Sequence, residues 1–79
     1  MEIIEKIVAR MRENPKGIRF DDLVKVCEHY FGESRIKGSH RIYRTPWPGD
    51  PRVNIQDDKG KAKAYQVRQI VQAIDKLER

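Results

Sequence analysis

Apolar residues recur every three to four positions in three segments of this chain, and this spacing constrains its fold more than any other feature. The pattern is typical of amphipathic helices, each of which buries one face. It predicts a helix over 2–13, a second one that begins near Phe20 and ends at Gly32, and a last one after Lys63. The apolar positions are Ile3, Ile4, Ile7, Val8 and Met11, then Phe20, Leu23, Val24, Cys27, Tyr30 and Phe31, then Val67, Ile70, Val71, Ile74 and Leu77.

Residues 33–56 show a different pattern, with short runs rich in β-branched and aromatic residues that are separated by turns. Such runs predict an antiparallel sheet, so the chain would have an α+β fold of two layers. The helices would cover one face of this sheet and leave the other open. The predicted order α-α-β-β-β-α has strands over 34–37, 40–45 and 52–56, a turn at Gly38-Ser39, a rigid proline-rich loop over 46–51 and a further loop over 57–63.

The chain of 79 residues is long enough for one domain with a thin core. A domain of this size buries about 60% of the surface that its unfolded chain exposes, so we expect any reactive group on an open face. The one cysteine, Cys27, lies in an apolar helical pattern, which indicates a buried, reduced thiol in a cytoplasmic protein. Charges among the apolar residues of 1–11 argue against a signal peptide or a membrane span.

The net charge of +5 arises from the middle of the chain. Residues 33–68 hold nine Lys or Arg and four Asp or Glu, whereas the charges of 1–32 and of 69–79 cancel. A basic segment between neutral ones is typical of a protein that binds a nucleic acid. The alternative is that this charge serves only solubility.

The predicted hairpin of the basic segment carries His40 directly after a Gly-Ser turn. Histidine is well suited to exchange a proton near neutral pH, and cleavage of RNA without a metal needs such a base or acid. Neighbouring cations would stabilise the charge that develops on the phosphate. The alternative is a surface histidine at the start of a solvated strand. The candidate residues of this hairpin are Arg35, Lys37, Gly38, Ser39, His40, Arg41 and Arg44.

A second basic cluster, formed by Lys59, Lys61 and Lys63, precedes the last helix. Lysines at a helix N-terminus oppose the helix dipole, and a bound phosphate would relieve that conflict. Arg68, one turn into the helix, would extend this cluster. The alternative is a flexible, solvated loop.

The sequence favours few other chemistries. Cys27 and His29 are two residues apart on a helix and point in different directions, so we predict no metal site and an exposed His29. No cofactor is expected. Tyr43 and Trp47 are candidates for stacking on bases, and Trp47 is alternatively a hydrophobic lid or a partner contact.

Three stretches carry a more specific signal, namely FDDL at 20–23, KGSHRIY at 37–43 and KGKAKAYQVR at 59–68. Together they resemble the HicA toxins of bacterial toxin–antitoxin pairs. The resemblance covers residues 18–77, so 1–17 would be a helix and turn appended to a HicA-like core of 18–79. Its most specific part is Gly-Ser-His at the start of the second strand.

The resemblance implies a fold like that of a double-stranded-RNA-binding domain and a metal-independent endoribonuclease that cleaves mRNA. It implies that His40 is catalytic, that Gly38 is the turn glycine, and that a HicB-type antitoxin covers the active face. We expect a toxin that does not itself bind DNA. Its RNA-binding residues would be Arg35, Lys37, Gly38, Ser39, Arg41, Arg44, Lys59, Lys61, Lys63 and Arg68. Two alternatives remain, a non-catalytic RNA-binding module and a protein-interaction module that docks an acidic partner.

Overall fold

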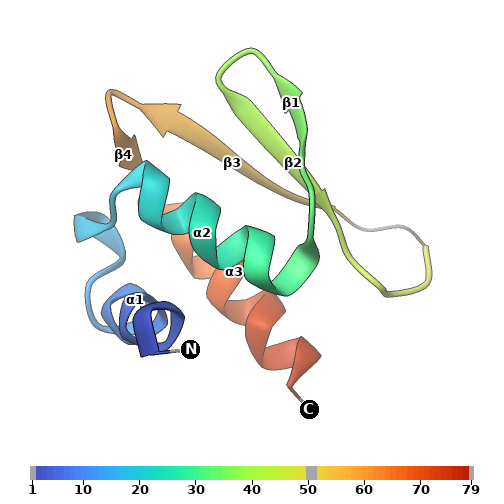
Figure 1. Ribbon diagram of the computed structural model, residues 1–79, viewed down its shortest axis with the longest axis horizontal. Helices are drawn as coiled ribbons and strands as arrows, with labels where there is room; N and C mark the ends of the chain where they lie inside the picture. The colour runs from blue at the N-terminus through green and yellow to red at the C-terminus, as the bar shows by residue number, and fades with distance from the viewer. Residues whose placement is uncertain (1, 50–51, 79) are drawn as a thin grey trace.

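The computed structural model describes residues 2–49 and 52–78 (Figure 1). Over these residues the chain has an α+β fold in which three α-helices accompany a four-stranded antiparallel sheet. None of the helices in this part of the chain has the length and the apolar character needed to span a bilayer. The elements are α1 (Glu2–Glu13), the short 3₁₀ helix η1 (Pro15–Gly17), α2 (Phe20–Phe31), β1 (Arg35–Lys37), β2 (His40–Arg44), β3 (Arg52–Asp58), β4 (Lys61–Ala62) and α3 (Ala64–Leu77).

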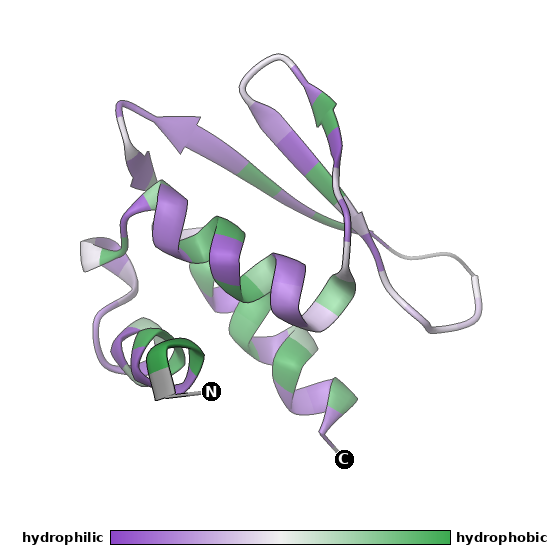
Figure 2. Cartoon of the chain, in the orientation of Figure 1, coloured by the Kyte–Doolittle hydropathy of each residue, from purple (hydrophilic) through white to green (hydrophobic). Residues whose placement is uncertain are grey.

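The three predicted helices are confirmed, and their ends follow from the local sequence. Pro15 lacks the backbone N–H that would continue α1, and it begins η1 instead. α2 ends where Gly32 adopts a φ of 86°, and the Gly32 N–H donates a hydrogen bond to the carbonyl oxygen of Glu28. Hydrophobic and hydrophilic residues alternate around each helix, as expected of amphipathic helices (Figure 2).

The sheet has one strand more than the sequence predicts. β3 continues to Asp58, and Lys61–Ala62 pair with it as β4, so the predicted loop over 57–63 was wrong. The turn between β3 and β4 has positive φ at both central residues, 53° at Lys59 and 86° at Gly60, as in a type I′ hairpin turn. Lysine rarely occupies the first of these positions, where Asn, Asp or Gly would have indicated the hairpin.

The strands follow the order β1-β2-β3-β4, and α2 and α3 lie together against one face of the sheet (Figure 1). Side chains alternate along each strand, so every second residue points to the helices. Tyr43 of β2 and Ile55 of β3 point this way and are fully buried, in one core with Leu23 of α2 and Val67 of α3. The predicted two-layer arrangement therefore holds for α2 and α3.

The first helix forms an additional layer, because α1 packs against α2, α3 and η1. Met11, at the centre of this contact, is fully buried in the same core. Two ion pairs flank it. Arg10 on α1 contacts Asp22 on α2 at 3.0 Å, and Arg12 contacts Asp75 on α3 at 2.6 Å. α1 is thus part of the folded core of the domain.

Candidate nucleic-acid interface

The face of the sheet that turns away from α2 and α3 carries mainly polar and charged side chains. Directly paired residues on antiparallel strands share a face, and neighbours along one strand point to opposite faces. Because Tyr43 and Ile55 point to the helices, the residues next to them point away. We call this surface the open face. From one end of the strands to the other it holds Lys61 and Asp58, then Lys37, His40 and Gln56, then Arg35, Ile42 and Asn54, then Arg44 and Arg52.

His40 is half-buried at the start of β2, within this row of side chains. Its direct partners are Lys37 on β1 and Gln56 on β3. The Nδ1 atom of His40 lies 3.3 Å from Oδ1 of Asn54. Since an amide oxygen only accepts hydrogen bonds, this contact fits the tautomer of the imidazole in which Nδ1 is the donor and Nε2 carries the lone pair. Asn54 was not among the residues predicted for the site, although the alternation over 52–56 puts it on the polar side of β3.

The Gly38-Ser39 turn sets the position of His40. Gly38 has a φ of 62° whereas Ser39 does not have a positive φ, which is the pattern of a type II′ turn. A Cβ atom on Gly38 would meet no atom within 4 Å, so the backbone conformation and not lack of space requires glycine here. The Ser39 carbonyl oxygen accepts a hydrogen bond from the Asp57 N–H at 3.1 Å, which fixes the turn against β3.

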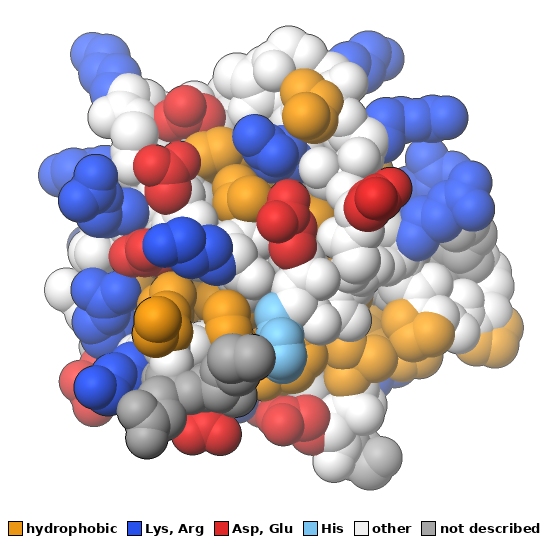
Figure 3. All heavy atoms as spheres, viewed as in Figure 1, with side chains coloured by type: hydrophobic (Ala, Val, Ile, Leu, Met, Phe, Trp, Pro, Cys, Tyr) orange, Lys and Arg blue, Asp and Glu red, His pale blue; other side chains and the backbone are white. Residues whose placement is uncertain are grey.

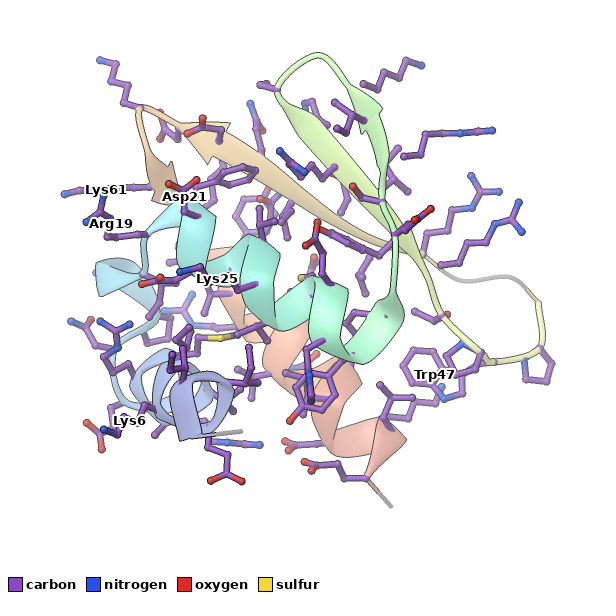
Figure 4. The ribbon with its side chains drawn as sticks, viewed as in Figure 1. Lys6, Arg19, Asp21, Lys25, Trp47 and Lys61 are labelled. Carbon is purple, nitrogen blue, oxygen red and sulfur yellow. The ribbon has the colours of Figure 1, made fainter. Side chains whose placement is uncertain are left out.

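The open face gains a further cation from the segment before α2. Lys61 on β4 pairs with Asp58 on one side and with Arg19 on the other, where Arg19 forms an isolated β-bridge. Figure 4 shows the side chains of Arg19 and Lys61 extending away from the molecule on the same side. Arg19 was not predicted for the site, because the charges of 1–32 cancel. The pairing with Lys61 brings it beside the basic cluster.

The lysine cluster surrounds the start of α3. Lys59, Lys61 and Lys63 line an open pocket of about 650 Å³ there, and Lys16 of η1 joins them. Asp58 is the acidic residue of this lining. The structure thus brings the predicted cluster together and adds a lysine that is distant in the sequence.

Two predicted RNA-binding residues lie away from His40. Arg41 follows His40 on β2 and points to the helices, where its Cζ atom lies 5.8 Å from the centroid of the Phe20 ring. Arg68 lines a groove between α1 and α3. The structure therefore leaves both residues off the open face.

The aromatic candidates also lie away from the open face. Stacking of Tyr43 on a base is excluded, because its side chain is fully buried. The centroid of its ring lies 6.4 Å from that of Phe31. Burial raises the pKa of Tyr43 to about 12. Trp47 is half-buried, and the Nζ atom of Lys76 on α3 lies 4.3 Å from the centroid of its ring (Figure 4). This contact favours the interpretation of Trp47 as a lid on the end of α3.

The burial of Cys27 and the exposure of His29 agree with the prediction. Cys27 is a buried free thiol, and burial raises its pKa. His29 is exposed on α2, and its ring packs edge-on against that of Tyr30, with 4.9 Å between the two ring centroids. Among residues 2–49 and 52–78, no three His, Cys, Asp or Glu side chains are grouped closely enough to hold a metal ion.

Comparisons with protein-family models, with curated proteins and with solved structures find no match to this chain. The function must therefore be inferred from the residues themselves. The open face combines a histidine whose ring is oriented by Asn54 with cations at both ends of the strands.

Proposed function

We propose that this chain is a HicA-type toxin, a cytoplasmic endoribonuclease that cleaves mRNA without a metal and is inhibited by a HicB-type antitoxin. One observation carries the proposal: Nδ1 of His40 is hydrogen-bonded to Asn54, which leaves Nε2 free on an open, cationic surface. The order of α2, the first three strands and α3 supports a fold like that of a double-stranded-RNA-binding domain. α1 and β4 are additions to it.

In this proposal the scissile phosphate lies beside His40, and its Nε2 accepts the proton of the RNA 2′-hydroxyl. The 2′ oxygen attacks the phosphorus, and the bond from phosphorus to the 5′ oxygen breaks. The leaving oxygen takes a proton from water or from Lys37, the direct partner of His40 on β1. The products are a 2′,3′-cyclic phosphate and a 5′-hydroxyl. A positioned base of this kind contributes about 10²–10⁴-fold to the rate.

The distribution of cations supports an extended polyanion as the ligand. Lys61 and Arg19 lie towards one end of the strands from His40, and Arg44 lies towards the other. An RNA backbone that crosses the open face from β4 to β2 and then follows β2 past His40 would pass all of them. Fixed cations near the scissile phosphate also stabilise the charge of the transition state. An antitoxin that covers the same face would be expected to present acidic side chains to it.

The test is a time course of RNA cleavage in EDTA with the wild type, His40→Ala and His29→Ala. His29 is a matched control because it is an exposed histidine on α2, on the helical side of the sheet. We expect the wild type and His29→Ala to cleave equally and His40→Ala to be inactive. End-group analysis should find 2′,3′-cyclic phosphates, and DNA of the same sequence should stay intact.

Two results would favour the alternatives. RNA that is bound but cleaved by none of the three proteins would indicate a non-catalytic RNA-binding module. A chain that binds no RNA at physiological salt would instead be a protein-interaction module with an acidic partner. Salt dependence of binding alone does not separate these cases, because every phosphate contact weakens as salt rises.

A further inference from the structure

An aromatic ring lies among the lysines that line the pocket at the start of α3. We call this site the lysine pocket, and its lysines are Lys16, Lys59, Lys61 and Lys63. Tyr65 lines the same pocket and is 54% exposed, whereas the other Phe, Tyr and Trp side chains of the protein are buried or half-buried. Figure 3 shows Lys and Arg side chains along the left-hand edge of the molecule, where η1 and the β3–β4 turn lie. An exposed ring among cations is typical of surfaces that bind single-stranded nucleic acids.

The ring of Tyr65 is connected to the sheet through Gln66. The side chain of Gln66 is buried, and its Oε1 accepts a hydrogen bond of 2.8 Å from the backbone N–H of Gln56. Its Nε2 lies 3.4 Å from the hydroxyl oxygen of Tyr65, to which it can donate. Gln56 is in turn the direct partner of His40. Among the described residues no cation or second ring stacks on Tyr65, so the face of its ring is available to a ligand.

The backbone of Lys59 is strained. Its φ is 53°, and no other residue besides glycine has a positive φ in the part of the chain that the structure describes. Asn, Asp or Gly adopts this conformation at a lower energetic cost. The side chain of Lys59 is exposed and forms no ion pair with the described residues that would offset this cost. Strain of this kind indicates that the side chain has a role with a ligand.

The charge and the size of the lysine pocket fit one nucleotide. Asp58 contributes one negative charge to the lining, against four positive charges from the lysines, and no ion pair joins it to them within 2–49 and 52–78. The isolated β-bridge to Lys61 places Arg19 beside the pocket as a further cation. The volume of about 650 Å³ lies within the range of about 300–1,000 Å³ that is typical of ligand sites.

The tyrosine determines which form of RNA the pocket can hold. A base stacks on a protein ring when its face is not covered by a neighbouring base pair, as in single-stranded RNA. We propose that the lysine pocket binds one nucleotide of single-stranded RNA, with its base on Tyr65 and its phosphate held by the lysines. Lys61 and Asp58 form the row next to that of His40, about 7 Å away at a rise of about 3.3 Å per residue. That the same RNA reaches His40 as a substrate rests on the function proposed above.

The test measures RNA affinity in the His40→Ala background, so that no RNA is cleaved. The probes are a single strand of about twelve nucleotides and the same strand paired with its complement. Tyr65→Leu keeps an apolar side chain but lacks the ring, so it should weaken binding of the single strand about tenfold, as expected for one lost stacked base. Tyr65→Phe keeps the ring and should restore most of this affinity. The affinity for the duplex should stay nearly constant in both variants.

A second measurement detects the stacking itself. A fluorescent purine analogue in the single strand should be quenched on binding to the parent protein and to Tyr65→Phe, but not on binding to Tyr65→Leu. Ile3→Ala is the matched control, because Ile3 is 65% exposed on α1 and does not line the lysine pocket. It should change neither the affinity nor the quenching. Circular dichroism and thermal unfolding show whether each variant is folded.

Lys59→Asn separates binding from stability. Asparagine readily adopts a positive φ, so the urea midpoint of unfolding should rise. The affinity for the single strand should fall, and the slope of log affinity against log salt should become shallower by about 0.7, as for one lost phosphate contact. Lys25→Gln is the control for a lost surface cation, because Lys25 is exposed on α2 and lies on the helical side (Figure 4). A loss no larger than that of Lys25→Gln would overturn the role of Lys59.

The outcomes separate this proposal from the ribonuclease proposal. Equal losses for single strand and duplex, or no loss in Tyr65→Leu, would overturn the nucleotide site even if the wild type cleaves RNA. A loss confined to the single strand and restored in Tyr65→Phe would support the site even if the wild type cleaves nothing, and the ribonuclease proposal would then fail alone. Binding of a polyglutamate peptide through the same lysines, without binding of RNA, would also overturn the site.

Discussion

Oδ1 of Asn54 lies 3.3 Å from Nδ1 of His40, although the two residues are not direct partners in the sheet. Asn54 pairs with Ile42, and His40 pairs with Gln56, so the contact runs diagonally across β2 and β3. Diagonal neighbours on one face are within reach of long side chains. The position of the imidazole therefore depends on the register of β2 against β3 as well as on the turn before it.

Asn54→Ala should lower the rate of RNA cleavage about tenfold with little change in KM. The reason is that a hydrogen bond of this kind contributes about 0.5–1.5 kcal/mol, and 1.4 kcal/mol corresponds to a factor of ten in rate. Asn54→Asp keeps an acceptor oxygen beside Nδ1 and should retain more activity than Asn54→Ala. Steady-state kinetics of the three proteins provides the measurement. Equal losses for both variants would mean that Asn54 does not orient the ring.

Met11→Ala should destabilise the domain by about 2–5 kcal/mol, because it leaves a cavity among fully buried side chains. Arg12→Ala is the matched change on the exposed side of the same helix. The side chains of the Arg12–Asp75 ion pair are 42% and 47% exposed, so water screens the pair and its loss should cost about 0.2–1 kcal/mol. Urea unfolding of the two variants measures both values. Similar costs for the two changes would contradict the view that α1 is held mainly by its apolar face.

The free energy of unfolding should fall as the pH rises from about 10 to about 12. Burial raises the pKa of Tyr43 in the folded protein to about 12, whereas a tyrosine in an unfolded chain titrates near 10. Below pH 10 the phenol is protonated in both states, so stability is at its full value. Above pH 10 the unfolded chain loses the proton first and becomes more favourable.

Tyr43→Phe isolates this effect, because the variant lacks the phenol but keeps the buried ring. Its stability should decline less steeply between pH 10 and pH 12 than that of the wild type. Comparison of the two slopes in urea unfolding removes the contributions of Cys27 and Tyr30, whose pKa values burial also raises. Parallel pH profiles of the two proteins would contradict the assignment to Tyr43.

The helices were predictable because their signal is local. The apolar spacing of 2–13 and of the residues from Phe20 to Phe31 repeats over three turns, and the packing against the core follows the same period. β4 was not predictable in this way, because it consists of only Lys61–Ala62. Lysine and alanine both have a low propensity for strands, so pairing with β3 is what holds this segment in the sheet. Short strands depend on their partners more than on their own sequence.

The candidate site was predicted in part, for a similar reason. His40 and its turn were predictable from residue type alone. A Gly-Ser pair between two predicted strands indicates a tight turn, and a histidine among cations indicates proton transfer near a phosphate. The prediction that Tyr43 stacks on a base was wrong, because the sequence does not show to which face of β2 this residue points. Arg41 pairs with the buried Ile55, so Tyr43, two residues further along β2, points to the helices as well. Arg19 and Asn54 join the site only through strand pairing, which no local pattern contains.

The two edges of the sheet are protected from other chains by different means. Residues 18–20 cover β4, with hydrogen bonds of 3.0 Å from the Phe20 N–H to the Gly60 carbonyl oxygen and from the Ala62 N–H to the Ile18 carbonyl oxygen. At the other edge, β1 is only three residues long, and charged side chains flank its exposed Ile36. Short, charged edges discourage strand addition between copies of a protein. The open face is therefore exposed on a sheet whose edges, at β1 and β4, present little unpaired backbone to a second copy of the chain.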